Sequence, residues 1–175
     1  GYNMNMIYKI AKEKLKGSHD YSHAQRMLGY ARVLNSKYNG SWKIIEASIL
    51  LHEFMKHKPE DSRKFLKGFS DKEIENVIHC IKTHYCLKNC NPKTIEAKIV
   101  QDCDTLDMLG AIGIARGFMS GGERGLDLIE TKNEYKCKRL EVYKKLNLKE
   151  SRKMADKKFR FTKLFFKSID KEMVK

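Results

Sequence analysis

The most informative stretch of this sequence is Ala47-Ser48-Ile49-Leu50-Leu51-His52-Glu53-Phe54-Met55-Lys56. It is an apolar run that closes on a histidine with a carboxylate directly beside it. Burying a carboxylate without a partner is costly, so such a group is normally paired with a counter-charge or bound to a metal ion. The pair His52-Glu53 therefore predicts further polar partners elsewhere in the chain.

Two other segments supply such partners. His23 lies upstream, at the end of Ser18-His19-Asp20-Tyr21-Ser22-His23, and an acidic cluster that contains Asp104 lies downstream, at residues 101–107. One His, a His–acid pair and an Asp on separate helical segments would make an N2O2 site that suits divalent Mn, Fe, Co, Ni or Zn, with Mg as a further candidate. Spacing alone leaves this open, because hydrogen-bonded core histidines and capping carboxylates explain the same residues equally well.

Composition favours a globular, soluble chain. The 175 residues fit one domain, with 41% hydrophobic and 33% charged residues. No run approaches the roughly 20 apolar residues of a membrane span, so no membrane partner is expected. The five cysteines are odd in number and show no framework spacing, which favours reduced thiols and a cytoplasmic location.

The net charge of +14 has two explanations. It could attract nucleic acid or nucleotides, or it could reflect lysines that solvate helix surfaces. The lysines are spread along the chain without a dense block or interleaved aromatic residues. We therefore favour solvation over nucleic-acid binding, although a basic surface would still concentrate a phosphorylated substrate.

Apolar residues recur every three to four positions, and prolines occur only at Pro59 and Pro92. This spacing predicts an all-α, single-domain helical bundle that spans residues 1–175, with the helix that carries His52 at its centre. Asn91-Pro92 is expected to open a helix that continues through the acidic cluster, and residues 120–122 are expected to form a loop. The expected helices cover about residues 7–15, 22–38, 42–58, 71–84, 92–117, 133–146 and 151–172.

The order of these motifs resembles the HD-domain superfamily of metal-dependent phosphohydrolases, in which a His, a His-Asp pair and an Asp follow one another on an all-helical fold. The matching residues are His23 with Arg26, the run 49–53, and Ile99-Val100-Gln101-Asp102-Cys103-Asp104-Thr105-Leu106-Asp107. Residues 18–23 and 109–116 are similar to a small single-domain branch. The resemblance covers about residues 15–120, and helices within 121–175 are expected to complete the bundle.

The resemblance implies hydrolysis of a phosphoester or phosphoanhydride, commonly of a nucleotide, by water activated on a divalent metal. It implies that His23, His52, Glu53 and Asp104 hold the metal, with Glu53 and Asp104 also serving catalysis. It selects Asp104 rather than Asp102, a choice that helical angles leave open.

Five further residues are expected around this site. Arg26 and Lys56 would hold phosphate oxygens, and His84 would contact a leaving-group oxygen or a second metal. Asp20 would orient His23 from behind, and Asp107 would share the helix face of Asp104 and accept a hydrogen bond behind the metal ligands. Three of them have a simpler explanation: a surface salt bridge for Arg26, solvation of a helix end for Lys56, and packing or exposure for His84.

One departure from the family pattern stands at Glu53, where the family has Asp. Glutamate is one methylene longer, so it would move the ion or alter its coordination. The alternative hypothesis is therefore a degenerate module that senses nucleotides or binds nucleic acid without significant catalysis. A structural zinc site at His79, His84, Cys86 and Cys90 is a weaker alternative, because the spacing lacks CxxC pairs.

Overall fold

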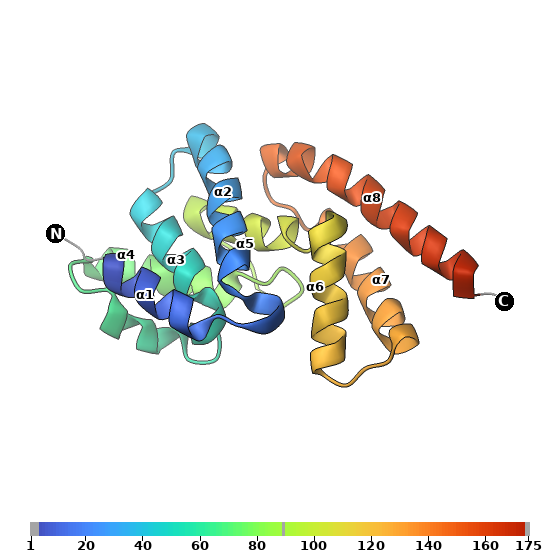
Figure 1. The fold of residues 1–175 in the computed structure, drawn as a ribbon. Helices are drawn as coiled ribbons and strands as arrows, with labels where there is room; N and C mark the ends of the chain where they lie inside the picture. Colours follow the sequence, from blue (N-terminus) through green and yellow to red (C-terminus); the bar gives the residue numbers. More distant parts are fainter. Residues whose placement is uncertain (1–3, 89, 174–175) are drawn as a thin grey trace.

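The computed structural model describes residues 4–88 and 90–173, and within them it contains helices and no strand. The all-α prediction is confirmed (Figure 1). Two short 3₁₀ helices, η1 (Gly17–His19) and η2 (Pro59–Phe65), join longer elements. The α-helices are α1 (Met4–Lys14), α2 (Tyr21–Tyr38), α3 (Trp42–Met55), α4 (Asp71–Thr83), α5 (Ile95–Leu106), α6 (Gly110–Glu123), α7 (Leu128–Lys144) and α8 (Lys149–Met173).

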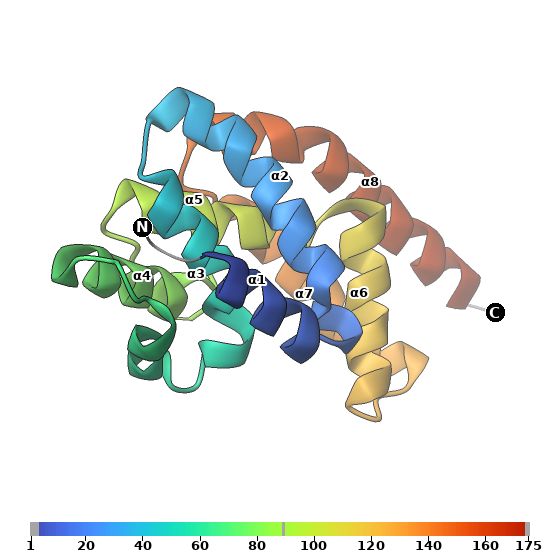
Figure 2. The ribbon, with the colours of Figure 1, turned by 60° about the vertical axis from the view of Figure 1, so that its left-hand side comes forward.

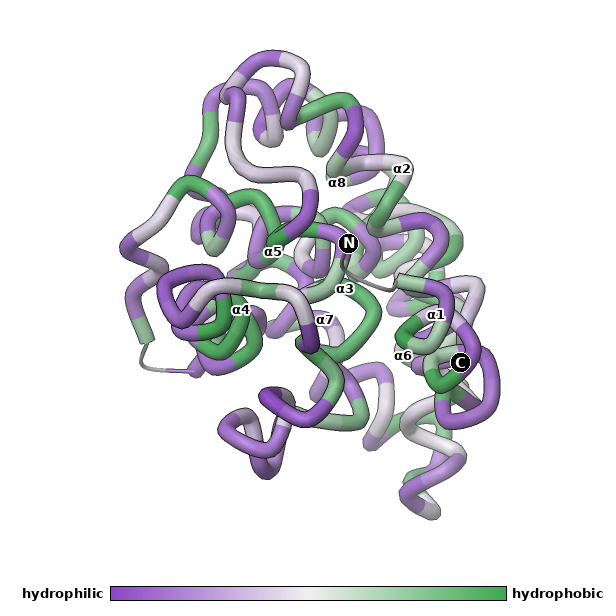
Figure 3. The backbone as a smooth tube through the Cα atoms, turned by 90° about the vertical axis from the view of Figure 1, so that its left-hand side faces the viewer, coloured by the Kyte–Doolittle hydropathy of each residue, from purple (hydrophilic) through white to green (hydrophobic). Residues whose placement is uncertain are grey.

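Helix α3 is the centre of the N-terminal part, as its apolar sequence predicted. Every residue from 44 to 52 is buried, and α3 contacts α1, α2, α4 and α5 (Figures 1 and 2). Each large aliphatic side chain buried there contributes about 1.5–3 kcal/mol. Hydrophobic residues gather where α3, α4 and α5 meet (Figure 3). The polar end of α3, at His52-Glu53, is thereby held in a rigid frame.

Helices α6, α7 and α8 stand together on one side of the molecule (Figure 1). They contact one another, and the α5–α8 and α6–η1 contacts join them to the other helices. No helix in the described ranges is long and apolar enough to span a membrane.

The prediction of one helix from Pro92 to Gly117 is wrong at both its start and its middle. Helix α5 begins later, because the Thr94 side chain caps it by accepting a hydrogen bond from the Ala97 backbone N–H at 3.1 Å. The helix then ends at Leu106, and α6 begins at Gly110, whose φ of +76° lies in the left-handed region. The Gly110 N–H donates to Thr162 Oγ1 of α8 at 2.9 Å, which fixes the break.

The predicted loop at residues 120–122 is also wrong, because α6 continues through it to Glu123. Gly121 is buried against α7, and a Cβ atom there would collide with the Thr131 side chain. The glycine thus serves close helix packing rather than a turn. The chain turns only before Asp127, which forms a capping box with Glu130 and opens α7 earlier than predicted.

Candidate metal centre

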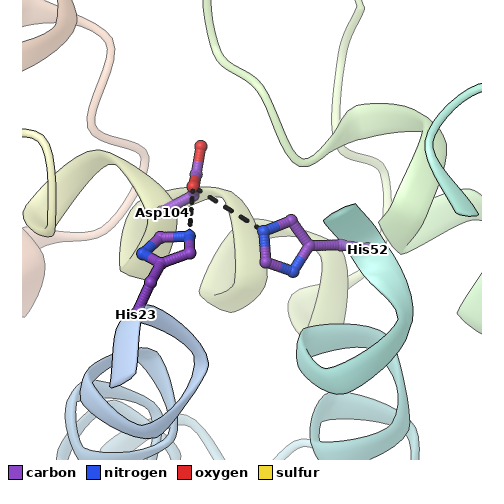
Figure 4. Close-up of side chains that lie close together, drawn as sticks. All are labelled: His23, His52 and Asp104. Carbon is purple, nitrogen blue, oxygen red and sulfur yellow. Dashed lines mark ion pairs between the residues drawn. The ribbon is translucent and has the colours of Figure 1, made fainter. Parts of the chain in front are cut away.

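Three of the predicted metal ligands meet in one place. His23 lies in the first turn of α2, His52 in the last turn of α3 and Asp104 in the last turn of α5. Asp104 Oδ1 lies 3.3 Å from His23 Nε2 and 3.9 Å from His52 Nε2 (Figure 4). The two histidines are fully buried and Asp104 is nearly so. These atoms are close enough to share one metal ion.

The hydrogen bonds of the two histidines fix where their protons sit. His52 Nδ1 lies 2.7 Å from the Ile49 carbonyl oxygen, and His23 Nδ1 lies 2.6 Å from Asp107 Oδ2. Each of these oxygens accepts, so each Nδ1 carries the proton. Burial opposes the charging of His23, but the Asp104 and Asp107 carboxylates on either side raise its pKa. In the neutral form of both rings, the Nε2 atoms present lone pairs toward Asp104.

With both rings neutral, this arrangement lacks a hydrogen-bond donor. Within the described part of the chain, His23 Nε2 and His52 Nε2 have no hydrogen-bond partner although both are buried. Burial and the neighbouring His84 lower the pKa of His52 to about 3, so its ring is neutral at neutral pH. Burial alone would raise the pKa of Asp104, but the neighbouring His23, His84 and His52 lower it below its usual range. Acceptors that face one another fit a cation between them.

Asp20 and Asp107 both contact His23. The Asp20 side chain caps α2 and accepts from the His23 backbone N–H at 3.1 Å. Asp107 holds the imidazole ring and is itself completely buried. Asp20 thus places the backbone of His23, while Asp107 sets the orientation of its ring.

Arg26 has a different partner from the predicted phosphate. Its Nε and Nη2 donate to the two carboxylate oxygens of Asp107 at 2.8 and 3.0 Å, and its Nη1 donates to Ser22 Oγ at 2.9 Å. Arg116 Nη1 lies 3.1 Å from Asp107 Oδ2 as well. Arg26 is therefore engaged in holding the residue that orients His23.

Two aspartates of the acidic cluster, Asp102 and Asp104, have different partners in the structure. Asp102 is buried, and its carboxylate accepts from the backbone N–H groups of Asn147 and Leu148, each at 2.9 Å. It therefore anchors the connection between α7 and α8, whereas Asp104 faces the histidines. This geometry agrees with the choice of Asp104.

Glu53 lies beside this cluster rather than within it. Its Oε1 is 3.6 Å from His52 Nε2 and 3.7 Å from His19 Nε2, while its Oε2 accepts from Lys56 Nζ at 2.9 Å. Burial opposes its ionisation, but the surrounding histidines and the Lys56 ammonium lower its pKa to about 2. Glu53 is therefore ionised at neutral pH, and Lys56 partly neutralises it.

His84 joins Glu53 and His52 in a second group of potential ligands. Its Nδ1 lies 2.6 Å from the Ile81 carbonyl oxygen, so its Nε2 is also an acceptor. Its ring centroid lies 4.8 Å from that of His52. The alternative zinc site is not assembled in the described residues, because His84 faces His52 while His79 Nε2 accepts from the Lys93 backbone N–H.

A cavity of about 380 Å³ opens beside these groups. Glu53, His84 and Asp104 lie on its wall, together with Tyr85 and Tyr135. Its basic lining residues are Lys56, Lys88, Arg116, Arg124, Lys138 and Arg139. Acceptor groups that fit a metal thus stand beside a cationic surface that fits an anion.

No sequence pattern predicted the part of this cavity that α7 supplies. Tyr135, Lys138 and Arg139 belong to a helix in which no motif was recognised. A usable signal was the four-residue spacing of Gly113, Gly117 and Gly121 on α6, which predicts close packing by a neighbouring helix. The interpretation of residues 120–122 as a loop concealed that spacing.

No protein-family model matches the chain. The chain is 27% identical to the uncharacterized protein YpgQ of Bacillus subtilis (strain 168), with 95% of this chain and 90% of YpgQ covered. The crystal structure of Bacillus subtilis YpgQ in complex with ADP covers 98% of both chains with a TM-score of 0.79 and 24% identity. A crystal structure of an HD-superfamily hydrolase from Bacillus thuringiensis matches 97% of this chain and 95% of its own, with a TM-score of 0.75 and 28% identity. The expected resemblance to the HD-domain superfamily is therefore confirmed.

Proposed function

The chain has the fold and the ordered histidine and aspartate motifs of the HD-domain superfamily, and from this premise we propose that it is a metal-dependent phosphohydrolase. Its substrate would be a nucleotide or another small phosphoester or phosphoanhydride. One observation carries the proposal: the buried cluster of His23, His52 and Asp104, whose two Nε2 atoms have no hydrogen-bond partner, borders a cavity with a cationic lining.

His23, His52 and Asp104 would hold the divalent ion, with Glu53 as a further ligand on the cavity side. A bound ion would supply a hydroxide nucleophile near neutral pH and would offset charge that grows on phosphorus. Asp107 would keep the His23 ring in the tautomer that leaves Nε2 free.

Residues on the cavity wall would bind the substrate. Lys56 would bind a phosphate oxygen close to Glu53, where its ammonium already lies. His84 would contact the leaving-group oxygen from the cavity wall, where the Ile81 carbonyl oxygen holds its ring through Nδ1. The B. subtilis relative was crystallised with ADP, which supports a nucleotide as the first substrate class to test.

Phosphate and pyrophosphate release from a panel of nucleoside mono-, di- and triphosphates tests the proposal, with Mn, Co, Ni, Zn, Fe and Mg supplied separately. Wild type should turn over at least one nucleotide, and His52→Ala should not. Turnover that is equal in wild type and His52→Ala, or absent from both, would contradict the proposal.

A nucleotide-sensing module remains the second candidate, because Lys56 partly neutralises Glu53 and Glu53 stands outside the His23 group. Equilibrium binding of ADP to wild type, measured beside the hydrolysis panel, separates the two functions. Tight ADP binding without turnover under any metal would favour the sensor.

A further inference from the structure

Arg139 is a buried cation without a counter-charge. Its side chain is 3% exposed, and its Nη2 donates to the Gly113 carbonyl oxygen at 3.1 Å. Its Nε and Nη1 have no hydrogen-bond partner, and no carboxylate in the described residues pairs with it. Burial lowers the pKa of Arg139 to about 10, so the guanidinium is still charged at neutral pH. Two unused N–H donors on a buried cation indicate a missing anionic partner.

The α6–α7 packing holds this guanidinium in a fixed place. A Cβ atom at Gly117 would come within 2.8 Å of Arg139 Nη2 and 3.0 Å of Tyr135 Cδ1, so α7 approaches α6 as closely as a glycine permits. The guanidinium carbon lies 4.5 Å from the centroid of the Tyr135 ring, which stacks against it. Arg139 is therefore preorganised before any ligand arrives.

The position of Arg139 points to the substrate cavity. Arg139 and Asp104 line the same cavity, and the charge of Asp104 acts to raise the pKa of Arg139. Three other cations on this wall already have partners: Lys56 pairs with Glu53, and Arg124 and Lys138 both pair with Glu134. Arg139 differs from them in being both buried and unpaired.

We propose that the terminal edge of Arg139, Nη1–H together with the Nη2–H that does not bond Gly113, binds two oxygens of a substrate phosphate other than the one held at the metal centre. A guanidinium that presents two N–H groups matches two oxygens of one phosphate group. The α7 wall would then select di- and triphosphates over monophosphates. This inference rests on the proposed function for its ligand class, but binding tests it without any turnover.

The test compares inorganic pyrophosphate with inorganic phosphate by calorimetric titration of metal-loaded protein. Wild type should bind pyrophosphate more tightly than phosphate. Arg139→Met should weaken pyrophosphate binding by about 10- to 100-fold while changing phosphate binding less than about 3-fold, because only the distal group loses its charged hydrogen bonds. Arg160→Met is the matched control, since Arg160 is an exposed arginine of α8 outside the cavity, and it should leave both affinities unchanged.

Thermal unfolding of the ligand-free protein separates this role from a structural one. Arg139→Met should unfold at the same or a higher temperature than wild type, because it removes an unpaired buried charge. A clear fall in Tm together with retained pyrophosphate preference would assign Arg139 to packing and overturn the proposal. Equal weakening of phosphate and pyrophosphate would overturn it as well.

Arg139→Lys covers the case in which the methionine variant does not fold. Lysine keeps the charge but lacks the planar pair of N–H donors of a guanidinium. The preference for pyrophosphate should therefore fall by at least about 5-fold relative to wild type. A lysine variant with the full wild-type preference would refute recognition by the guanidinium. If wild type binds pyrophosphate yet hydrolyses no nucleotide, the proposed function fails while this inference stands.

Discussion

Asp107 Oδ2 lies 2.6 Å from His23 Nδ1, and neither side chain reaches solvent. The same carboxylate accepts from Arg26 and lies against Arg116. One buried aspartate thus connects the ring that faces the proposed metal with two guanidinium groups. Asp107 therefore fixes the tautomer of His23 and also balances the positive charge of Arg26 and Arg116.

Replacing Asp107 by Asn should therefore damage both metal binding and stability. We expect metal affinity to fall by about 10- to 100-fold, because the partner that orients His23 loses its charge. The free energy of unfolding should fall by about 3–5 kcal/mol, because Arg26 and Arg116 lose a buried counter-charge. Chelator competition and urea denaturation measure the two effects. Wild-type metal affinity in a folded Asp107→Asn protein would contradict the assigned role.

The two neighbouring aspartates provide a direct test of the ligand assignment. Asp104→Asn should lose metal and activity, because its carboxylate faces both histidines. Asp102→Asn should keep metal, since its carboxylate caps Asn147 and Leu148. Elemental analysis of each purified protein after metal loading measures the outcome. An empty site in Asp102→Asn with a filled one in Asp104→Asn would reverse the assignment.

Shortening Glu53 tests the departure from the family pattern. Glu53→Asp should retain metal and raise turnover, because it restores the shorter carboxylate and withdraws it from Lys56. Lys56→Met is the companion variant, since it removes the neutralising ammonium but leaves the carboxylate. Metal content and initial rates measure both. Unchanged metal and turnover in Glu53→Ala would show that residue 53 is not a ligand.

The lowered pKa of Glu53 predicts how stability depends on pH. The pKa of Glu53 is about 2 in the folded protein and 4.5 in its ordinary state, so folding favours the ionised form. The stabilisation is complete above about pH 4.5 and is lost as the pH falls toward about 2. Urea denaturation of metal-free wild type and Glu53→Gln should give a stability difference that shrinks through this window. A difference that grows on acidification would contradict the ionised state.

Two glycines of α6 give a matched pair for the packing of α7. Gly117→Ala should destabilise the protein by about 1–3 kcal/mol, because the added methyl group would press on Arg139 and Tyr135. Gly122→Ala should stabilise it by about 0.5–1 kcal/mol, because nothing lies within 4 Å of the added Cβ and alanine favours the helix. Thermal or urea unfolding compares them. Equal effects would show that α7 does not depend on the close approach at Gly117.

Local patterns in the sequence predicted much of this molecule. The apolar run of α3 predicted its central place, and the helix expected from residue 71 is α4, which a Ser70–Glu73 capping box opens. The motifs around His23, His52 and Asp104 predicted a cluster that the structure assembles. Their roles as metal ligands stay a prediction until metal is measured.

Local sequence patterns could not predict features that depend on contacts between distant parts of the chain. The break after Leu106 depends on Thr162 of α8, more than fifty residues away, and the pairing of Arg26 depends on Asp107. Arg139 carries no local signal at all, because its isolation arises only when α7 lies against Gly113 and Gly117. Periodicity reports which face of a helix is buried, but not which helix covers it.

The anchoring of the α7–α8 connection by Asp102 has a consequence for shortened versions of this chain. Asp102 and Asp104 are two residues apart on α5, so one short stretch of helix secures the C-terminal helices and supplies a carboxylate to the histidines. Deleting the chain after Lys144 would leave Asp102 as a buried carboxylate without its donors. The last turn of α5 would have to shift to let water in, and Asp104 would move with it. A minimal fragment that keeps every motif residue would therefore lose the geometry of the histidine cluster.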